Sequence, residues 1–215
     1  MSHNSVLVQC DFDGTLTVGD ISFLILDEFT GTDWRKEFDD YMLGKITVNH
    51  FNAQAFSRVK ANRAELAQFV REKSVVRPGL TDLLRACRER DFRFTIVSNG
   101  MAFYIETFLQ MHGLADIEFI AGQAEFLSQG MKAWYPGPDG KPLEDEFKVA
   151  WTDHFLKQGY RLIYIGNGVS DFAPASRCSH IFAIDNLVAE CHKAGVGHTP
   201  FGDLHDVARV LRELG

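Results

Sequence analysis

The stretch Val6–Asp20 reads VLVQCDFDGTLTVGD, and in it an apolar run ends abruptly in two aspartates, Asp11 and Asp13. In a strand that continued to Asp13, both side chains would point to the same face, because successive side chains alternate. Two carboxylates so close together repel each other. Such a pair needs a cation or a reaction that uses it, so the end of this run is the first candidate for a functional site.

Similar short apolar runs recur along the chain, each followed by a segment that reads as a helix. Runs that are apolar throughout are typical of strands buried on both faces of a sheet. We therefore predict an α/β fold, a parallel sheet with helices on both faces. The predicted strands are residues 6–8, 92–100, 116–122, 161–168 and 180–185, and the predicted helices are residues 79–90, 102–112, 146–157, 171–176, 187–193 and 204–214.

Two segments interrupt this alternation. Residues 21–73 hold spaced apolar residues and no strand-like run, which predicts a small helical insert after the first strand. Residues 122–145 carry glycines and prolines around a short apolar piece, which predicts a β-hairpin or loop. We expect a core domain of residues 1–18 and 76–215, which includes that hairpin or loop, and a helical domain of residues 19–75.

The composition limits the class of protein. The chain has 215 residues, 46% of them hydrophobic and 24% charged, which is ordinary for a globular protein with one core and a small accessory domain. Its net charge of −7 argues against a nucleic-acid partner. No apolar stretch approaches the roughly 18 residues that a membrane span needs. We expect a small-molecule partner, and a monomer or homodimer.

The cysteines and the N-terminus indicate a compartment. Four cysteines, Cys10, Cys87, Cys178 and Cys191, lie far apart and form no C-x-x-C pair. This spacing favours neither a zinc site nor a disulfide framework. Acidic residues come too early for a signal peptide. We therefore expect a cytoplasmic protein with reduced thiols.

Polar residues also follow two further predicted strands, where the loops of a parallel sheet form its ligand crevice. One strand ends in Ser98-Asn99-Gly100, and another ends in Gly166–Asp171, which reads GNGVSD. Lys148 lies at the start of the helix before the latter strand. Two carboxylates, a hydroxyl beside backbone amides, an ammonium and a further acid form a coherent set for phosphate and Mg²⁺.

Each of these signals has an ordinary structural explanation when it is taken alone. An Asp-x-Asp after a strand is usually a turn or a helix cap, a Ser-Asn-Gly is usually a turn, and a lone lysine is usually solvated. Their joint occurrence, each at a predicted strand end or on the adjoining helix, is what favours a functional site.

Four segments, taken in order, resemble the four motifs of the haloacid dehalogenase superfamily: DFDGT (11–15), VSNG (97–100), Lys148 and GNGVSD (166–171). The resemblance spans nearly the whole chain. It implies a Rossmann-like core and a phosphoric monoester hydrolase that uses Mg²⁺.

Within this superfamily the chain is similar to the phosphoserine phosphatase-like branch, whose helical cap follows the first motif. It resembles still more the methionine-salvage phosphatases that act on 2-hydroxy-3-keto-5-methylthiopentenyl-1-phosphate, whose pattern is echoed in residues 181–204. The helical domain of residues 19–75 would then be the cap. A small phosphomonoester of either kind is the implied substrate.

The resemblance also implies roles for single residues. Asp11 would be the nucleophile that forms an aspartyl-phosphate, and Asp13 would protonate the leaving alcohol and then activate water. An Asp at position 13 favours phosphoryl transfer, because the dehalogenases of the superfamily lack it. Phosphate or substrate would be bound by Phe12, Thr15, Asp20, Ser98, Asn99, Gly100 and Lys148, and Mg²⁺ by Asp11, Asp13 through its main-chain carbonyl, Asn167 and Asp171.

Asn167 departs from the family pattern, which generally has an acid here that ligates Mg²⁺ directly. The amide still offers a carbonyl oxygen but removes one negative charge from the site, for which Asp171 is a candidate to compensate. The departure keeps a second hypothesis open, a phosphate-ligand-binding or regulatory protein with a weakened metal site.

Two other phosphate-binding classes are disfavoured. A response-regulator receiver also gathers aspartates, Ser or Thr and Lys around Mg²⁺, but it is about half as long as this chain. A P-loop is unsupported, since Gly44-Lys45 lacks the upstream glycine and the following Ser or Thr.

Residues of the expected cap bear on the substrate. Asp20 stands where phosphoserine phosphatases generally have a Glu that binds the substrate ammonium, but we favour a role as the cap of a helix beginning at Ile21. Arg58 is a candidate to bind a carboxylate, although its spacing from Gly44-Lys45 does not match, so phosphoserine is the less favoured substrate. Candidates to line the leaving-group pocket, with core or hairpin packing as the favoured alternative, are Phe23, Trp134 and Tyr135.

Overall fold

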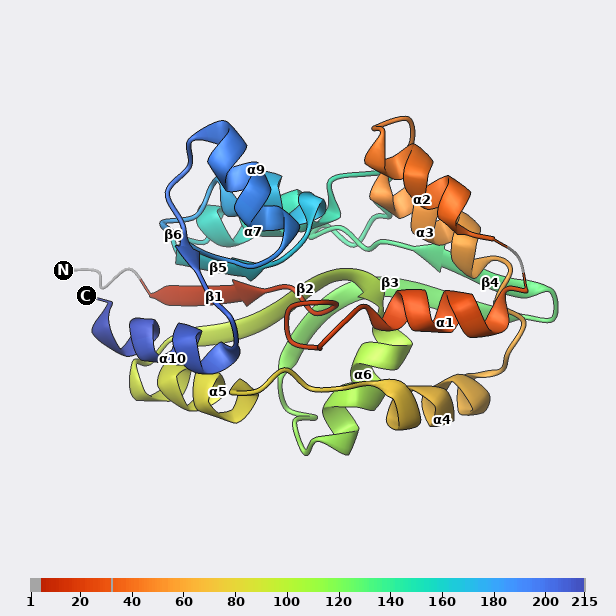
Figure 1. The fold of residues 1–215 in the computed structure, drawn as a ribbon, viewed down its shortest axis with the longest axis horizontal. Coiled ribbons are helices and arrows are strands. Elements are labelled where there is room, and N and C mark those ends of the chain that lie inside the picture. The colour runs from red at the N-terminus through yellow and green to blue at the C-terminus, as the bar shows by residue number, and fades with distance from the viewer. Residues whose placement is uncertain (1–4, 32, 215) are drawn as a thin grey trace. The chain divides into compact units, whose positions relative to one another are not determined.

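The computed structural model describes residues 5–31 and 33–214 (Figure 1). Its strands form a seven-stranded sheet in the order β4-β3-β2-β1-β5-β6-β7. The chain divides into two compact units, and strand β2 crosses from one to the other between residues 97 and 98. The first unit holds the residues up to 19, residues 75–97 and those from 148 onward, and the second holds residues 20–74 and 98–147.

The first unit contains the parallel part of the sheet. Strand β1 pairs with β2 on one side, Cys10 opposite Ile96, and with β5 on the other, Cys10 opposite Ile165. Helices α7 and α9 lie on one face of these strands, and α5 and α10 on the other (Figure 1). The elements are β1 (Val6–Cys10), α5 (Leu80–Glu89), β2 (Arg93–Met101), α7 (Phe147–Lys157), β5 (Arg161–Gly166), a 3₁₀ turn (Val169–Asp171), α8 (Phe172–Ala175), β6 (His180–Ala183), α9 (Asn186–Ala194), β7 (Thr199–Pro200) and α10 (Leu204–Glu213).

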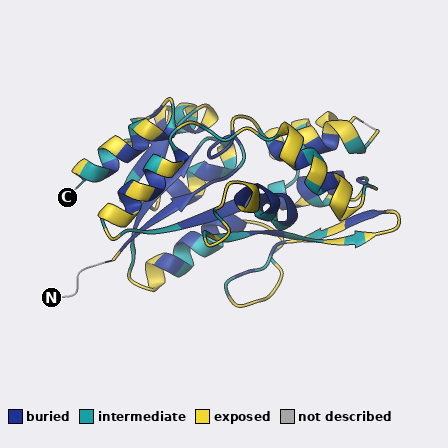
Figure 2. Cartoon of the chain, turned by 90° about the horizontal axis from the view of Figure 1, so that it is seen from below, coloured by how far each residue is buried: buried dark blue, intermediate teal, exposed yellow. Residues whose placement is uncertain are grey.

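Burial explains why these strands carry uninterrupted apolar runs. All five residues of β1 are buried, and so are the last five of β5, because helices cover both faces of the sheet (Figure 2). Every predicted strand and helix of this unit is present within a few residues of its predicted ends, which confirms the α/β prediction. The prediction omitted β7, whose two residues are too few for an apolar run.

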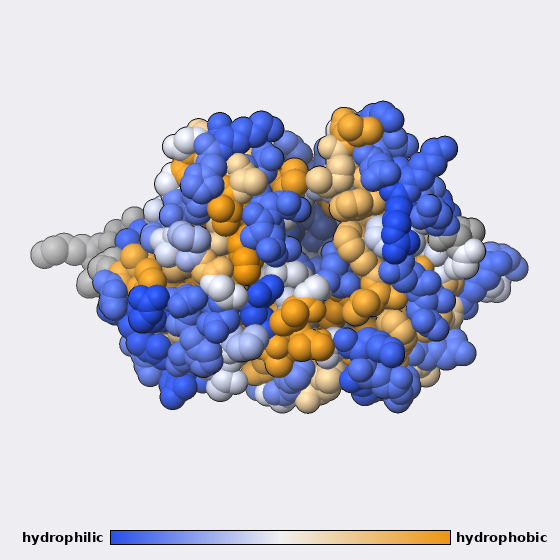
Figure 3. Space-filling view, viewed as in Figure 1, coloured by the Kyte–Doolittle hydropathy of each residue, from blue (hydrophilic) through white to orange (hydrophobic). Residues whose placement is uncertain are grey.

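Helices α5 and α10 are amphipathic, with one side buried and the other facing outward. Both bury apolar side chains, such as Leu83 of α5 and Leu211 of α10. Hydrophilic residues predominate over their outer side (Figure 3). There, Arg212 of α10 lies 2.7 Å from Asp82 and 2.8 Å from Glu89 of α5.

The second unit contains the predicted helical segment together with a hairpin. Residues 21–73 form four helices and pair with no strand of the sheet among the described residues, as predicted. Of the two predictions for residues 122–145, a β-hairpin or a loop, the structure has the hairpin, with Gln123 opposite Trp134 and a first strand that already begins at Glu118. The elements are α1 (Ile21–Phe29), α2 (Arg35–Met42), α3 (Val48–Phe56), α4 (Arg63–Lys73), α6 (Ala102–Met111), β3 (Glu118–Leu127) and β4 (Gly130–Trp134).

This unit is larger than the helical domain expected from the sequence, because residues 98–147 belong to it as well. The role of residues 19–75 as a cap stays a prediction. Side-chain caps start some of its helices: Asp20 accepts a hydrogen bond from the N–H of Phe23 at 3.0 Å, and Thr47 accepts one from the N–H of His50 at 3.1 Å. The favoured role of Asp20 as a helix cap is thus confirmed.

The aromatic residues considered for the leaving-group pocket have packing partners within this unit. Phe23 and Trp34 lie with ring centroids 4.6 Å apart, in a cluster with Phe38 and Phe51. Tyr135 is buried, whereas Trp134 is partly exposed on the hairpin.

No helix in residues 5–31 or 33–214 is long and apolar enough to cross a membrane.

Candidate active site

The turn after β1 is built around one carbonyl group. The carbonyl oxygen of Phe12 accepts hydrogen bonds from the N–H groups of Thr15 at 3.2 Å and Leu16 at 2.9 Å. Gly14 has a φ of 72°, a left-handed conformation that glycine adopts without strain. The turn therefore bends the chain sharply between Asp11 and Thr15, and it presents the side chains and carbonyls of DFDGT at the end of β1.

Arg77 holds this turn from outside. Its Nε donates to the carbonyl oxygen of Thr15 at 2.8 Å, and its Nη2 donates to that of Gly14 at 2.7 Å. Arg77 was not among the residues predicted from the sequence. In the sequence, Arg77 stands before the proline that precedes a predicted helix, and this pattern does not indicate a function.

Asp11 and Lys148 form a buried ion pair. Asp11 directly follows β1, and its N–H donates to the carbonyl oxygen of Ile165 on β5 at 2.9 Å. Lys148 is the second residue of α7, and its Nζ lies 2.7 Å from Asp11 Oδ1. Asp11 is 5% exposed and Lys148 is 3% exposed. Both are therefore buried, whereas most aspartates and lysines in proteins lie at the surface. Asp13, two residues on, is only partly buried.

A second carboxylate, Asp171, shares the same lysine. Lys148 Nζ lies 2.6 Å from Asp171 Oδ1, and Asp171 is fully buried. Together Asp11, Asp171 and Lys148 carry a formal charge of −1 away from water. Burial, with Asp171 next, raises the pKa of Asp11 to about 7, although Lys148 opposes the shift. Burial lowers the pKa of Lys148, but the two carboxylates outweigh it and hold that pKa above its ordinary value.

Asn167 lies against the turn that carries Asp13. Its Oδ1 accepts a hydrogen bond from the hydroxyl of Thr15 at 3.1 Å. A Cβ on Gly14 would lie 2.2 Å from Asn167 Nδ2, so only glycine leaves room for this amide. The Asn167 side chain is thus placed beside the DFDGT turn, although the two are far apart in the sequence.

The oxygen atoms around the turn suit Mg²⁺, which prefers hard oxygen ligands. The Asp11 carboxylate, the Asp13 carbonyl and the Asn167 amide oxygen are of this type. Within the described ranges, no three His, Cys, Asp or Glu side chains gather as a metal-ligand group, so a site here needs amide or main-chain oxygens. Asp171 Oδ2 accepts from the N–H groups of Asn167 at 3.0 Å and Gly168 at 2.8 Å, and its role as a metal ligand stays a prediction.

Ser98, Asn99 and Gly100 lie near the end of strand β2, before its last residue, Met101, and belong to the second unit. Their part in binding phosphate stays a prediction. The Ser98 hydroxyl accepts a hydrogen bond from the N–H of Gly100 at 3.0 Å. Asn99 is tied to α3, since its Nδ2 donates to Asn49 Oδ1 at 3.0 Å and its carbonyl accepts from Asn52 Nδ2 at 2.9 Å. Asn49 and Asn52 were not predicted from the sequence, where the signal for them is two amides one helical turn apart.

The remaining predicted substrate residues have local partners. Phe12 is fully buried, and Asp20 caps α1 as described above. Arg58 forms an ion pair with Glu37 of α2. These contacts leave the expected substrate roles of Phe12 and Asp20 untested.

The sequence profile of haloacid dehalogenase-like hydrolases matches residues 8–176, most of the 215-residue chain. The chain belongs to this family. The match covers three segments of the candidate site, the DFDGT turn, Lys148 and the GNGVSD turn. The family expected from the sequence is thereby confirmed, and the chain is a hydrolase.

Two curated relatives in this family match over nearly their whole length. The 2-hydroxy-3-keto-5-methylthiopentenyl-1-phosphate phosphatase of Exiguobacterium sp. is 26% identical over 97% of this chain and 98% of its own. The phosphatase of the same name from Bacillus velezensis is 28% identical, over 97% of this chain and 91% of its own.

Solved structures of phosphoserine phosphatases share the fold of this hydrolase. One, a phospho-aspartyl intermediate analogue, has a TM-score of 0.74 at 16% identity and covers 96% of this chain and 99% of its own. Another, from T. onnurineus, has a TM-score of 0.73 at 18% identity, over 100% and 99% of the two chains. At this level of identity the likeness shows the fold, which is the HAD-like α/β fold expected from the sequence.

Proposed function

We propose that this phosphoric monoester hydrolase cleaves a small-metabolite phosphomonoester with Mg²⁺, through an aspartyl-phosphate on Asp11. The observation that carries the proposal is the buried contact of 2.7 Å between Asp11 Oδ1 and Lys148 Nζ, at the end of β1. The carboxylate can attack a phosphate group, and the ammonium beside it offsets the negative charge. The oxygen atoms of the adjacent turn are suited to bind a metal ion.

The proposed reaction has two steps. In the first, a carboxylate oxygen of Asp11 attacks phosphorus and the bond to the ester oxygen breaks, while Asp13 gives its proton to the leaving alcohol. In the second, Asp13 takes a proton from water, whose oxygen attacks phosphorus and releases phosphate from Asp11. Lys148 offsets the negative charge of the carboxylates and of the phosphoryl group throughout.

Mg²⁺, when bound, would offset the charge that gathers between Asp11 and the phosphoryl oxygens. Asp11, the carbonyl of Asp13 and Asn167 are the residues proposed to hold it. The Thr15 hydroxyl, which donates to Asn167 Oδ1, would keep that oxygen oriented.

We further propose a substrate like 2-hydroxy-3-keto-5-methylthiopentenyl-1-phosphate, on which the curated relatives act, rather than phosphoserine. Two local contacts support this choice. Asp20, a candidate for binding an ammonium, already caps α1, and Arg58, a candidate for binding a carboxylate, already pairs with Glu37. The described cysteines are all free, which supports the cytoplasm as the compartment.

The test is hydrolysis of 2-hydroxy-3-keto-5-methylthiopentenyl-1-phosphate and of phosphoserine, each with Mg²⁺ and with EDTA. Asp11→Asn should lower kcat at least ~10³-fold, about 4 kcal/mol of barrier, because the nucleophile is lost. The matched control is Asp153→Asn, a partly buried acid of α7 that is paired with Arg177.

Near-wild-type turnover by Asp11→Asn would exclude the nucleophile assignment. If the wild type hydrolyses neither ester at saturating Mg²⁺ but binds inorganic phosphate, the phosphate-binding or regulatory alternative replaces the proposal. Faster hydrolysis of phosphoserine would overturn the substrate choice alone.

A further inference from the structure

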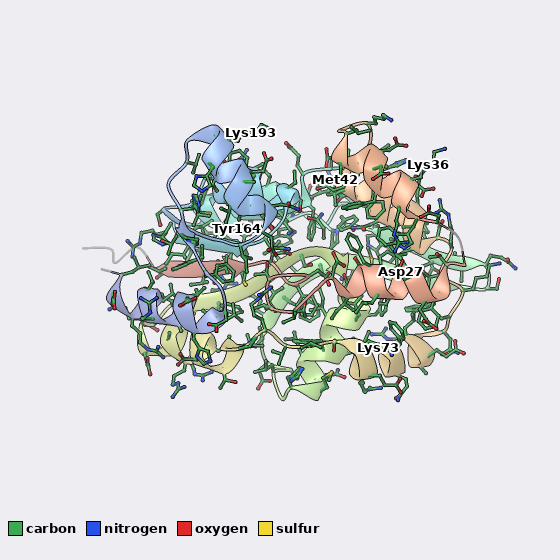
Figure 4. All side chains as sticks on the ribbon, viewed as in Figure 1. Asp27, Lys36, Met42, Lys73, Tyr164 and Lys193 are labelled. Carbon is green, nitrogen blue, oxygen red and sulfur yellow. The ribbon has the colours of Figure 1, made fainter. Side chains whose placement is uncertain are left out.

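Tyr164 places a hydroxyl group inside the apolar core of the first unit. It lies on β5 (Figure 4) and is fully buried. Its ring belongs to a cluster with side chains of α8, β6 and α9. A buried tyrosine hydroxyl needs a hydrogen-bond partner. That of Tyr164 donates to Asp171 Oδ1 at 2.7 Å.

Asp171 has donors on both of its oxygens. Oδ1 receives Tyr164 and the Lys148 ammonium, the latter at 2.6 Å, while Oδ2 receives the N–H groups of Asn167 and Gly168. An ionised carboxylate accepts about four hydrogen bonds, so these donors fill its capacity. Two of the four come from side chains, Lys148 and Tyr164. Apart from Lys148 itself, the Tyr164 hydroxyl is therefore the side-chain group that holds Asp171 Oδ1 in place.

The backbone makes room for this arrangement at Gly166. Tyr164 and Gly166 lie on the same face of β5, because alternate residues of a strand do so. A Cβ on Gly166 would lie 2.7 Å from Asp171 Cγ and 2.9 Å from Tyr164 Cε1. Any larger residue would push the carboxylate and the ring apart, so the sequence Y-x-G permits the contact.

We propose that Tyr164 is a positioning residue, whose hydroxyl holds Asp171 so that the Lys148 ammonium is directed at Asp11. The proposal rests on the role proposed above for Lys148. Lysine is a flexible side chain with a point charge, so its direction depends on the acceptors around it. Without the hydroxyl, the Asp171 carboxylate stays anchored at Oδ2 by the N–H groups of Asn167 and Gly168, but Oδ1 can pivot about that anchor. The ammonium then follows Oδ1 instead of spanning both carboxylates.

The test replaces Tyr164 by phenylalanine, which keeps the ring and removes the hydroxyl. We expect kcat to fall roughly tenfold, the size of one hydrogen bond to a charged group, with KM little changed. The ¹⁵N signal of the Lys148 ammonium should shift or broaden, because its surroundings loosen. The control is Tyr160→Phe, which removes a hydroxyl that lies 3.0 Å from Arg93 Nη1 in the same unit and should change neither readout.

A double-mutant cycle separates positioning from general damage to the core. If Tyr164 acts through Asp171, Tyr164→Phe should have no further effect on the Lys148 signal in the Asp171→Asn background. An equal effect in both backgrounds would overturn the proposal. An unchanged Lys148 signal in Tyr164→Phe would also overturn it.

The NMR readout needs no turnover, so it remains informative if the chain proves not to be a phosphatase. If Tyr164→Phe does not fold, Gly166→Ala takes its place, because its Cβ displaces the Asp171 carboxylate from Tyr164. The expected result is again a shifted Lys148 signal, and an unchanged signal would overturn the proposal.

Discussion

At the scale of single residues, Asn167 stands where the resemblance to the family implies an acid. Its amide oxygen is held by the Thr15 hydroxyl at 3.1 Å, beside the turn that carries Asp13. A neutral oxygen binds a hard cation less tightly than a carboxylate does. If Asn167 is a ligand, as proposed, the site should bind Mg²⁺ less tightly than a site with an acid at this position.

Asn167→Asp should therefore lower the Mg²⁺ concentration for half-maximal activity several-fold, since ligand charge raises cation affinity. The measurement is a Mg²⁺ titration of hydrolysis, repeated as Mg²⁺ binding by calorimetry. Asn186→Asp adds the same charge at an exposed position of α9 and is the control. If both variants keep the wild-type Mg²⁺ dependence, residue 167 is not a ligand.

At the scale of elements, the turn after β1 depends on a residue that precedes α5. Arg77 donates to the carbonyls of Thr15 and Gly14, and its own N–H donates to the carbonyl of Leu16 at 2.8 Å. The two side-chain bonds need the planar fork of a guanidinium, whose nitrogens point in fixed directions. Arg77 therefore links the segment before α5 to the geometry of the turn that carries Asp11 and Asp13.

Arg77→Lys should lower the free energy of unfolding by about 1–2 kcal/mol, because at least one buried carbonyl loses its donor. It should also lower kcat, because the turn that carries Asp11 and Asp13 becomes looser. Urea unfolding and the phosphatase assay measure the two effects. Arg209→Lys, at an exposed arginine of α10, should change neither. Wild-type stability in Arg77→Lys would show that the turn's own hydrogen bonds are enough to maintain it without the guanidinium.

At the scale of the whole molecule, the buried charges at the end of β1 affect stability. Asp11 has a pKa of about 7 in the folded, metal-free protein, raised by burial and by Asp171, against about 3.9 in an unfolded chain. For an acid whose pKa is raised on folding, the unfolded state loses its proton first as the pH rises. The metal-free protein should therefore lose stability between about pH 4 and pH 7.

Asp11→Asn removes this titration. It also brings the formal charge of the buried cluster of residues 11, 148 and 171 from −1 to zero. In EDTA at pH 8, it should raise the free energy of unfolding by at least about 1 kcal/mol, and the gain should shrink at pH 5. Chemical unfolding of both proteins at the two pH values measures the difference. Asp153→Asn should give no such gain. A gain that is the same at pH 5 and pH 8 would contradict the pKa assignment.

The sequence by itself determined the elements and the family. The strands of the first unit are visible because both faces are covered, so their apolar runs are uninterrupted. The cap of α1 at Asp20 follows from the short-range preference of an aspartate for the first N–H groups of a helix. The order of motifs at strand ends indicated Asp11, Lys148 and the GNGVSD turn, because parallel strands bring their carboxyl ends to one edge.

Only the tertiary structure decided the contacts that hold these residues. Arg77 and Thr15 are 62 positions apart, and nothing near either residue encodes their contact. Tyr164 reads as one more apolar residue of a buried strand until its hydroxyl is seen to meet Asp171. The physical reason is the same in both cases. Periodicity and capping depend on neighbours along the chain, whereas the partner of a buried polar group depends on which distant segments pack against it.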